Sequence, residues 1–393
     1  MHLSKEFMLA AACCRWPPSS KRDEAVRRAA SAAIDWQYFL RLVRRQRVDG
    51  LVNDGLQRGG VKVPTDVSAV LHRESQEIAR QTLTFAAESL RIHRLLEAEG
   101  LPHLFVKGVT LDRLAYGALG LKKARDIDLV IGAAAVETVC ALLAQSGYDR
   151  IVPGPEVSAE RFPIWLRLCK ETAWRHSRSG IVLELHTALV DNLALLRGVS
   201  AESPRQWVEI KGDARLPTLA DDELFAYLCV HGATHCWSRL KWIADVAALL
   251  KDADGPAIER LYRRSLALGV GRCSAQALLL CEALFELEVP PTLSAELKAD
   301  GSTQRLVRIA LGAMAGRHAE TELDDTVLGT VPIHLSHFLV APGWRYKMSE
   351  IRRKSLSHHD RATFALPRPL HFLYPLLVVP SWLWRRIRGL SPP

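Results

Sequence analysis

Residues 103–131 read HLFVKGVTLDRLAYGALGLKKARDIDLVI, a segment in which two short apolar runs flank a lysine–glycine pair and a helical pattern. The run at 103–106 is long enough only for a strand, and residues 109–116 have apolar positions at helical spacing. Residues 126–131 begin with alternating polar and apolar side chains, which is typical of a strand. The segment therefore predicts, in order, a strand, a turn, a helix and a second strand.

On both sides of this segment the apolar spacing is mainly helical. Residues 23–60 carry apolar positions at helical spacing, and a longer helix is predicted from Val67 to Glu99, ending at Gly100. After the central segment, residues 133–145 predict a helix. Two strands at 169–175 and 181–189 are predicted to form a hairpin around the Gly-containing turn at 177–180, and beyond Leu216 the pattern is helical again.

These elements predict an α+β protein, with a small mixed sheet flanked by N- and C-terminal helical regions. The expected division is a helical region at 1–98, a catalytic core at 99–200, a helical domain at 201–330 and a tail at 331–393.

The composition is that of an ordinary globular protein with a mild basic excess. The 393 residues are 48% hydrophobic and 24% charged, with a formal net charge of +9. This charge suits an acidic partner such as a nucleoside triphosphate, RNA or an anionic lipid. Part of it comes from four arginines at 41, 44, 45 and 47, which we expect on a solvated helix face; an RNA-binding patch is the sharper alternative.

Eight cysteines occur without a C-x-x-C pair, and most lie in apolar helical contexts. They are expected to be buried, reduced thiols in a cytoplasmic protein. Residues 1–14 contain no sustained apolar core before Arg15, so no signal peptide is predicted.

The C-terminal end combines apolar and basic residues. Residues 370–384 read LHFLYPLLVVPSWLW, and RRIR follows. Two prolines and a length of fifteen residues make this stretch unsuited to crossing a bilayer. It can pack into a groove of its own protein, or residues 370–388 can contact the inner face of the membrane peripherally, with Trp382 and Trp384 at headgroup depth.

Asp126 and Asp128 are two residues apart on a predicted strand, so both side chains point to one face. Two buried like charges are costly without counter-cations, and hard carboxylate oxygens are the ligands that Mg²⁺ prefers. An isolated Asp-x-Asp can equally lie on an exposed strand face.

Three neighbouring features favour the metal interpretation. Gly108 after Lys107 allows backbone N–H groups to approach phosphate at the start of a helix, and the charge of Lys107 can contact a triphosphate. Arg125 lies directly before the aspartates. Glu184, on the strand 181–186, supplies a third carboxylate if the two strands are neighbours.

Two further groups of polar residues leave alternatives open. His186 points to the same face as Glu184, where it can orient a ligand, move a proton or simply be a hydrogen-bonded strand histidine. His231 and His235 share a helix face near Cys229 and Cys236, which suggests zinc. Because no second Cys/His pair completes four ligands, a hydrogen-bonded histidine cluster is favoured over a zinc site.

The motifs FVKGV at 105–109, RDIDLVI at 125–131 and LELH at 183–186 resemble a family of uncharacterised bacterial nucleotidyltransferases in the polymerase-beta-like superfamily. The helical segment with His231, His235 and Trp237, followed by LKWIAD at 240–245, is similar to the same family. The resemblance covers about residues 99–250. It implies that Asp126 and Asp128 are paired metal ligands, that Glu184 is the third carboxylate, and that Gly108 lies in the phosphate-binding turn.

The chain departs from the superfamily at this turn, where Gly-Ser is usual and Lys107-Gly108 stands here; this matches the named family. The resemblance also favours a cleft bordered by the helix face of His231, His235, Lys241 and Asp245, which would bind the base or the acceptor.

The reaction expected is transfer of a nucleoside monophosphate from a nucleoside triphosphate to an acceptor hydroxyl, with Mg²⁺ or Mn²⁺ as the metal. The acceptor is left open among a peptide, a sugar, another small molecule and tRNA. The alternative is a non-catalytic protein that binds nucleotide or serves as a membrane-associated scaffold. Residues expected to contact nucleotide or cofactor, besides the three carboxylates, are Lys107, Gly108, Arg125, His186, His231, His235, Lys241 and Asp245.

Overall fold

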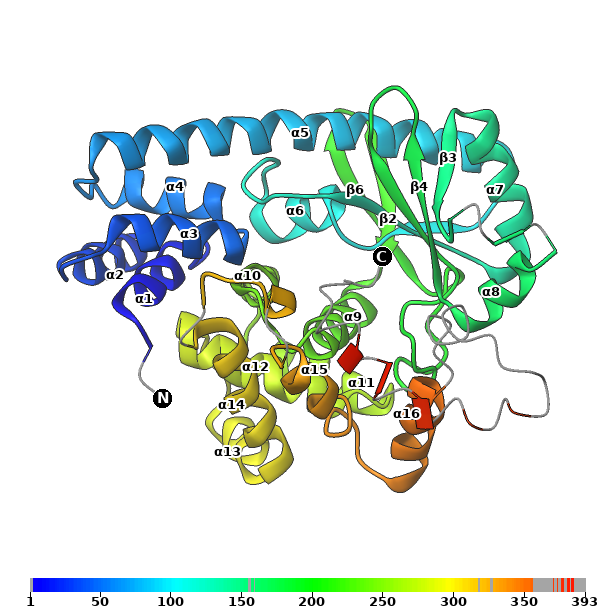
Figure 1. The fold of residues 1–393 in the computed structure, drawn as a ribbon. Helices are drawn as coiled ribbons and strands as arrows, with labels where there is room; N and C mark the ends of the chain where they lie inside the picture. The colour runs from blue at the N-terminus through cyan, green and yellow to red at the C-terminus, as the bar shows by residue number, and fades with distance from the viewer. Residues whose placement is uncertain are drawn as a thin grey trace.

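The computed structural model describes residues 3–154, 157–158, 160–316, 319–325 and 328–355, together with isolated residues between 370 and 384. A long helix, α5, runs along one edge of the molecule, with the N-terminal helices at one of its ends and the strands at the other (Figure 1). Within the described residues, no helix combines the length and the apolarity that crossing a bilayer requires.

The N-terminal part is helical. Its elements are α1 (Lys5–Cys13), α2 (Ser20–Ala30), α3 (Trp36–Gln46), α4 (Asp49–Arg58) and α5 (Thr65–Ala98). The first three begin at Ser4, Ser19 and Asp35, whose side chains accept hydrogen bonds from free N–H groups of the first turn. After α5, Gly100 adopts a positive φ of 65° and Leu101 N–H donates to Leu96 O, which ends the helix at the predicted residue.

The central sheet is mixed, as predicted. Its strands are β1 (His103–Phe105), β2 (Asp126–Ile131), β3 (Tyr148–Val152), β4 (Glu171–His176) and β5 (Val182–His186). Their spatial order is β1-β2-β5-β4-β3; β2 and β5 run parallel, and the other neighbours run antiparallel. The connecting helices are α6 (Val109–Tyr116), η1 (Ala133–Ala135), α7 (Val136–Gln145) and α8 (Phe162–Leu168). The protein is therefore α+β.

A second, two-stranded sheet follows at β6 (Arg205–Lys211) and β7 (Ala214–Leu219), around Gly212 with a φ of 55°. Neither this hairpin nor β3 is predicted from the sequence. In β6 a signal is present, because buried Val208 and Ile210 alternate with exposed neighbours. In β3 only Tyr148 is buried, so that strand has no clear alternation.

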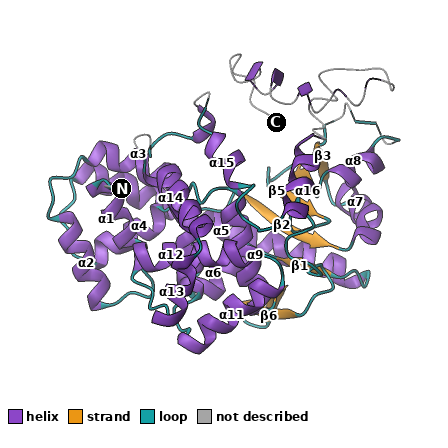
Figure 2. Ribbon diagram, turned by 90° about the horizontal axis from the view of Figure 1, so that it is seen from below, coloured by secondary structure: helices purple, strands orange, loops and turns teal. Residues whose placement is uncertain are grey.

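The remaining elements are helices. They are α9 (Asp221–Thr234), α10 (Leu240–Leu249), α11 (Gly255–Ala267), α12 (Gly271–Phe285), α13 (Pro291–Ala299), α14 (Gly301–Ala315), η2 (Leu323–Asp325), α15 (Val331–Ser336) and α16 (Trp344–Ser355). Seen from below, most helices gather on one side of the molecule, and the strands lie on the other side with α7, α8 and α16 beside them (Figure 2).

Buried apolar side chains form two clusters. The larger joins the N-terminal helices α1, α3 and α4 to the C-terminal helices α9, α10, α12 and α14. The smaller lies between the sheet, α5 and α7 and includes the hairpin β6–β7. Segments far apart in the chain thus share one apolar core. The expected division of the chain near residues 98, 200 and 330 stays a prediction.

The arginine run at 41–47 does not lie wholly on a solvated face. Arg45 is only 5% exposed, and its guanidinium donates to the carbonyls of Ser238 and, at 3.0 Å, of Thr321. Arg47 is half-buried. The solvated-face interpretation is therefore wrong for these two residues, because α3 packs against segments that follow 190 or more positions later.

All eight cysteines are free thiols, and the structure buries Cys229 and Cys236. Most of the predicted membrane-contacting tail, 370–388, lies outside the described residues.

Candidate active site

The parallel pairing of β2 with β5 brings the predicted carboxylates together. Asp128 is the register partner of Glu184, and Val130 is the partner of His186. Because side chains alternate along a strand, Asp128, Glu184 and His186 share one face of the sheet, while Leu129 and Leu185 enter the smaller core on the other face. The condition stated for Glu184 to join the aspartates, that the two strands are neighbours, is met.

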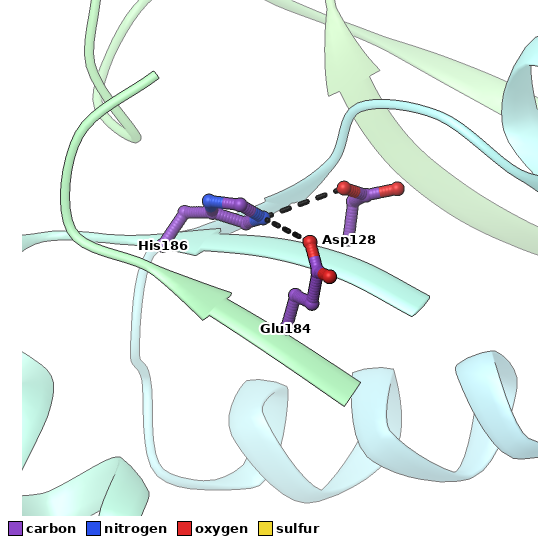
Figure 3. Close-up of side chains that lie close together, drawn as sticks. All are labelled: Asp128, Glu184 and His186. Atoms are coloured by element: carbon purple, nitrogen blue, oxygen red, sulfur yellow. Dashed lines mark ion pairs between the residues drawn. The ribbon is translucent and has the colours of Figure 1, made fainter. Parts of the chain in front are cut away.

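Asp128, Glu184 and His186 form a compact group in which Nε2 of the imidazole points toward both carboxylates (Figure 3). His186 Nε2 lies 3.3 Å from Asp128 Oδ1 and 3.5 Å from Glu184 Oε2. One ligand-capable atom from each residue lies within 4.8 Å of the others. On its far side, His186 Nδ1 lies 3.3 Å from Glu171 Oε2. Asp126 lines the same pocket but is not a member of this three-residue group.

The donor set fits a divalent cation. Asp128 Oδ1 and His186 Nε2 are buried and, within the described part of the chain, neither makes a hydrogen bond. Their contacts are charged ones, of which the shortest joins Asp128 Oδ1 to Lys107 Nζ at 2.6 Å. Carboxylate oxygens suit Mg²⁺, and a nearby imidazole is compatible with Mn²⁺.

The electrostatics of the group distinguish the two aspartates. Burial by itself would raise the pKa of Asp128, but Lys107 and His186 outweigh it and hold that pKa well below its usual range. Burial, followed by the charges of Asp128 and Glu184, raises the pKa of Asp126 to about 6. Of the two aspartates, Asp126 is therefore the one whose negative charge is less well neutralised by the protein, and its charged form would gain more from a divalent cation.

Gly108 forms the turn between β1 and α6. Its φ of 61° and ψ of −130° belong to a region that glycine adopts without strain, and it caps the start of α6. A Cβ built there would meet nothing within 4 Å, so the turn is open on the side of the pocket. Thr110 Oγ1 donates to the carbonyls of Phe105 and Lys107, which fixes the turn. The exposed start of a helix favours anions.

Every residue predicted to form the site lines one pocket of about 400 Å³. These residues are Asp126, Asp128, Glu184, Lys107, Gly108, Arg125, His186, His231, His235, Lys241 and Asp245. The pocket thus lies between the sheet, the start of α6, and helices α9 and α10.

A family model described as uncharacterised nucleotidyltransferase matches residues 32–286. The chain belongs to this family. The match contains the whole sheet, the pocket face of α10 and also α3, so it extends beyond the resemblance seen in the motifs alone. A search of curated proteins gives no match.

In this nucleotidyltransferase, His231 and His235 form an aromatic wall with Trp242. The two imidazole centroids lie 4.6 Å apart, and His235 lies 5.2 Å from the Trp242 ring. Burial, then the charge of Lys107, lowers the pKa of His235 to about 3, so this ring is neutral near pH 7. Among the described residues, the only group with metal-ligand spacing is the one at His186, so the zinc interpretation has no support.

Asp245 is held by other protein groups. Lys122 Nζ lies 2.9 Å from Asp245 Oδ2 and 3.1 Å from Asp112 Oδ1, and the Tyr116 hydroxyl donates to Asp245 Oδ1 at 2.9 Å. All four side chains are buried. These contacts attach α10 of the nucleotidyltransferase to α6, the helix that carries the Gly108 turn.

Several residues that line the pocket were not predicted as site residues. They are Arg47, Lys122, Lys123, Lys170, Glu171, Asp191, Arg239 and Trp242. The basic run at 122–125, directly before the paired aspartates, was a signal that could have found two of them. Arg47 belongs to the arginine run for which an RNA-binding patch was the alternative, and Arg239 carries no local signal; only the packing of α3 and α10 brings the two residues to the pocket.

Proposed function

We propose that this protein transfers a nucleoside monophosphate from a nucleoside triphosphate to an acceptor hydroxyl and releases pyrophosphate. The observation that carries the proposal is the parallel register of Asp128 with Glu184. Asp128 lies two residues after Asp126, and the three carboxylates line the same pocket as the Gly108 turn. That arrangement combines a carboxylate cluster with an anion-binding helix start, the two features that metal-assisted phosphoryl chemistry requires.

Asp126 and Asp128 would hold two Mg²⁺ or Mn²⁺ ions, and Glu184 would complete the ligands on the acceptor side. Bound metal would lower the pKa of the acceptor hydroxyl and offset charge on the phosphates. His186 holds the carboxylates of Asp128 and Glu184 in place through its Nε2 contacts, and Glu171 orients its other nitrogen. The protein's own contribution is positioning and charge, with no side-chain nucleophile.

Lys107, Gly108 and Arg125 are assigned to the phosphates, because they line the pocket beside the carboxylates. The neutral rings of His231 and His235 on the opposite wall offer a surface for the base or the acceptor. Asp245 acts on the site indirectly, since both its oxygens are bonded within the protein.

The test uses the purified protein, each labelled nucleoside triphosphate, Mg²⁺ or Mn²⁺, and fractionated RNA, protein and small-molecule extracts. Label should pass to one fraction with the wild type and not with Asp126→Asn. Asp149→Asn is a matched control, because Asp149 is an exposed aspartate on β3 of the same sheet and does not line the pocket. Absence of metal-dependent nucleotide binding by the wild type in calorimetry would refute the proposal.

The acceptor class is read from the fraction that takes the label. An RNA acceptor predicts binding that weakens steeply with salt, whereas a small acceptor does not. A cytoplasmic location with peripheral membrane contact through 370–388 is a separate proposal. It predicts that the full chain floats with liposomes and that removal of residues 370–393 abolishes flotation; equal flotation of the two chains would end it.

A further inference from the structure

Arg47 lines the pocket but belongs neither to the sheet nor to the C-terminal helices; it lies at the end of the N-terminal helix α3. It ends α3 with a left-handed backbone, at a φ of 56° and a ψ of 43°. A residue with a Cβ pays roughly 1 kcal/mol for this conformation, which glycine adopts freely. Its side chain nevertheless lines the pocket that contains Lys107 and Gly108. The chain thus keeps a long cation where the backbone alone would favour glycine.

The Arg47 guanidinium is only partly satisfied by the protein. Its Nε is buried and, among the described residues, has no hydrogen-bond partner. Burial, together with Arg239 and Arg125 nearby, lowers the pKa of Arg47 to about 10. A buried donor left without an acceptor costs roughly 1–3 kcal/mol, and more if the group is charged. This cost is removed if an anion enters the pocket beside Arg47.

Two other cations of the same pocket also lack an ion pair, although Arg125, unlike Arg47, is exposed. In the described part of the chain, neither Lys241 nor Arg125 forms an ion pair. Asp245 lies four residues after Lys241 on α10, but its two oxygens are already bonded to Lys122 and Tyr116. Burial and the neighbouring Lys122 lower the pKa of Lys241 to about 7.

Two nearby cations differ from these. Arg45, two residues before Arg47, is surrounded by backbone carbonyl acceptors, and Arg239 pairs with Glu322 at 2.8 Å. Arg239 lines the same pocket but is neutralised by Glu322, whereas among the described residues Arg47, Arg125 and Lys241 form no such ion pair. The residues concerned come from three segments: α3, the residue before β2, and α10.

We propose that Arg47 binds the β- and γ-phosphates of the nucleotide, together with Arg125 and Lys241, so that the N-terminal helical segment forms part of the nucleotide site. This inference rests on the proposed function. A guanidinium presents paired N–H donors to phosphate oxygens, which makes arginine suited to a polyphosphate. Arg47 therefore selects nucleotides that carry a polyphosphate over those with a single phosphate.

The test measures binding of each nucleoside triphosphate, its monophosphate, and pyrophosphate to the full chain by calorimetry in the presence of Mg²⁺. Arg47→Gln should weaken triphosphate and pyrophosphate binding about tenfold to a hundredfold, which is the usual effect of losing a charged hydrogen bond. Monophosphate binding should change less than about twofold. Arg44→Gln is the matched control, since Arg44 lies exposed on α3, pairs with the half-buried Glu74 at 2.6 Å and does not line the pocket.

A second variant separates binding from folding. Arg47→Gly removes the guanidinium and relieves the left-handed backbone, so the free energy of unfolding should stay equal or rise by about 1 kcal/mol while polyphosphate binding falls. A purely structural arginine would give the opposite result, with lower stability and unchanged affinity.

The outcomes distinguish this inference from the proposed function. Equal triphosphate affinity of wild type, Arg47→Gln and Arg47→Gly, with label transfer intact, overturns the role of Arg47 and leaves the transferase proposal standing. Polyphosphate binding that Arg47→Gln weakens, without transfer to any acceptor, supports Arg47 and refutes the transfer reaction. A wild type that binds none of the three probes overturns both.

Discussion

Asp128 on β2 and Glu184 on β5 are direct register partners in a parallel strand pair, although β3 and β4 lie between them in the chain. Parallel pairing fixes both Cα positions through the strand hydrogen bonds. The separation of the two carboxylates is therefore set by the sheet and not by a loop, which suits a site whose main task is to hold charges in place.

Glu184→Gln should reduce nucleotidyl transfer by at least about a hundredfold, a typical cost of losing one electrostatic contact to a transition state. Binding of the triphosphate should change by less than about threefold, because Glu184 is assigned to the acceptor side. Rates of label transfer and calorimetric affinities check the two parts. Glu209→Gln, at an exposed position of β6, serves as the control; a loss of affinity without a loss of rate would contradict the assignment.

Lys122→Met should lower the free energy of unfolding by about 3–5 kcal/mol, because it leaves the buried carboxylates of Asp112 and Asp245 without their cation. Chemical denaturation gives the measurement. The adjacent Lys123 is exposed, so Lys123→Met should change stability by no more than about 0.5 kcal/mol. Equal effects of the two substitutions would show that the buried cluster does not stabilise the fold.

Gly108→Ala should destabilise the protein by about 1–3 kcal/mol and weaken triphosphate binding, because φ at this turn is 61° and alanine is strained there. The built Cβ has open space, so the cost comes from the backbone alone. Gly301→Ala is the matched control: its Cβ also meets nothing, its φ is not positive, and it starts α14. Thermal unfolding compares the two, and an equally small shift for both would argue against strain at Gly108.

Acidification between about pH 6.5 and pH 4 should destabilise the protein through His103. Burial, only partly offset by its hydrogen bond to Leu101 O, lowers the pKa of this histidine from 6.5 to about 4. Between these two pKa values, His103 is protonated in the unfolded chain and neutral in the folded chain. The contribution is fully present above pH 6.5 and is lost as the pH falls toward 4, by about 3 kcal/mol in total.

His103→Phe removes this titration while keeping a buried ring. The slope of the unfolding free energy against pH, measured in urea at several pH values, should be smaller in the variant across that window. An identical slope in both proteins would mean that His103 does not couple folding to pH.

The strand at 126–131 and the helix at 109–116 have the predicted boundaries, because local signals agree there: a short apolar run, a glycine turn and a clear change of period. The sequence placed Glu184 beside Asp128 only on the condition that their two strands are neighbours. Nothing in the spacing states that β5 inserts between β2 and β4, since strand order depends on long-range packing.

Residues supplied by distant segments were the hardest to predict. Lys122 looks like one more surface lysine in the sequence, and only its neighbours Asp112 and Asp245 make it a buried cation. Arg47 looked like part of a solvated face for the same reason. Side-chain environments of this kind depend on contacts between α3, α6 and α10 that no local pattern encodes.

The shared apolar core has a consequence for biosynthesis. Helix α1 packs against α2, α3 and α4 and also against α12, so the part of its apolar face that meets α12 has no partner until residues 271–285 have been made. At ordinary rates of translation, this delay lasts on the order of tens of seconds. During that time the nascent N-terminal helices expose apolar surface to other chains. Ribosome-bound chains that stop before α12 should therefore aggregate or recruit a chaperone. Aggregation and chaperone binding should both fall sharply once that helix emerges.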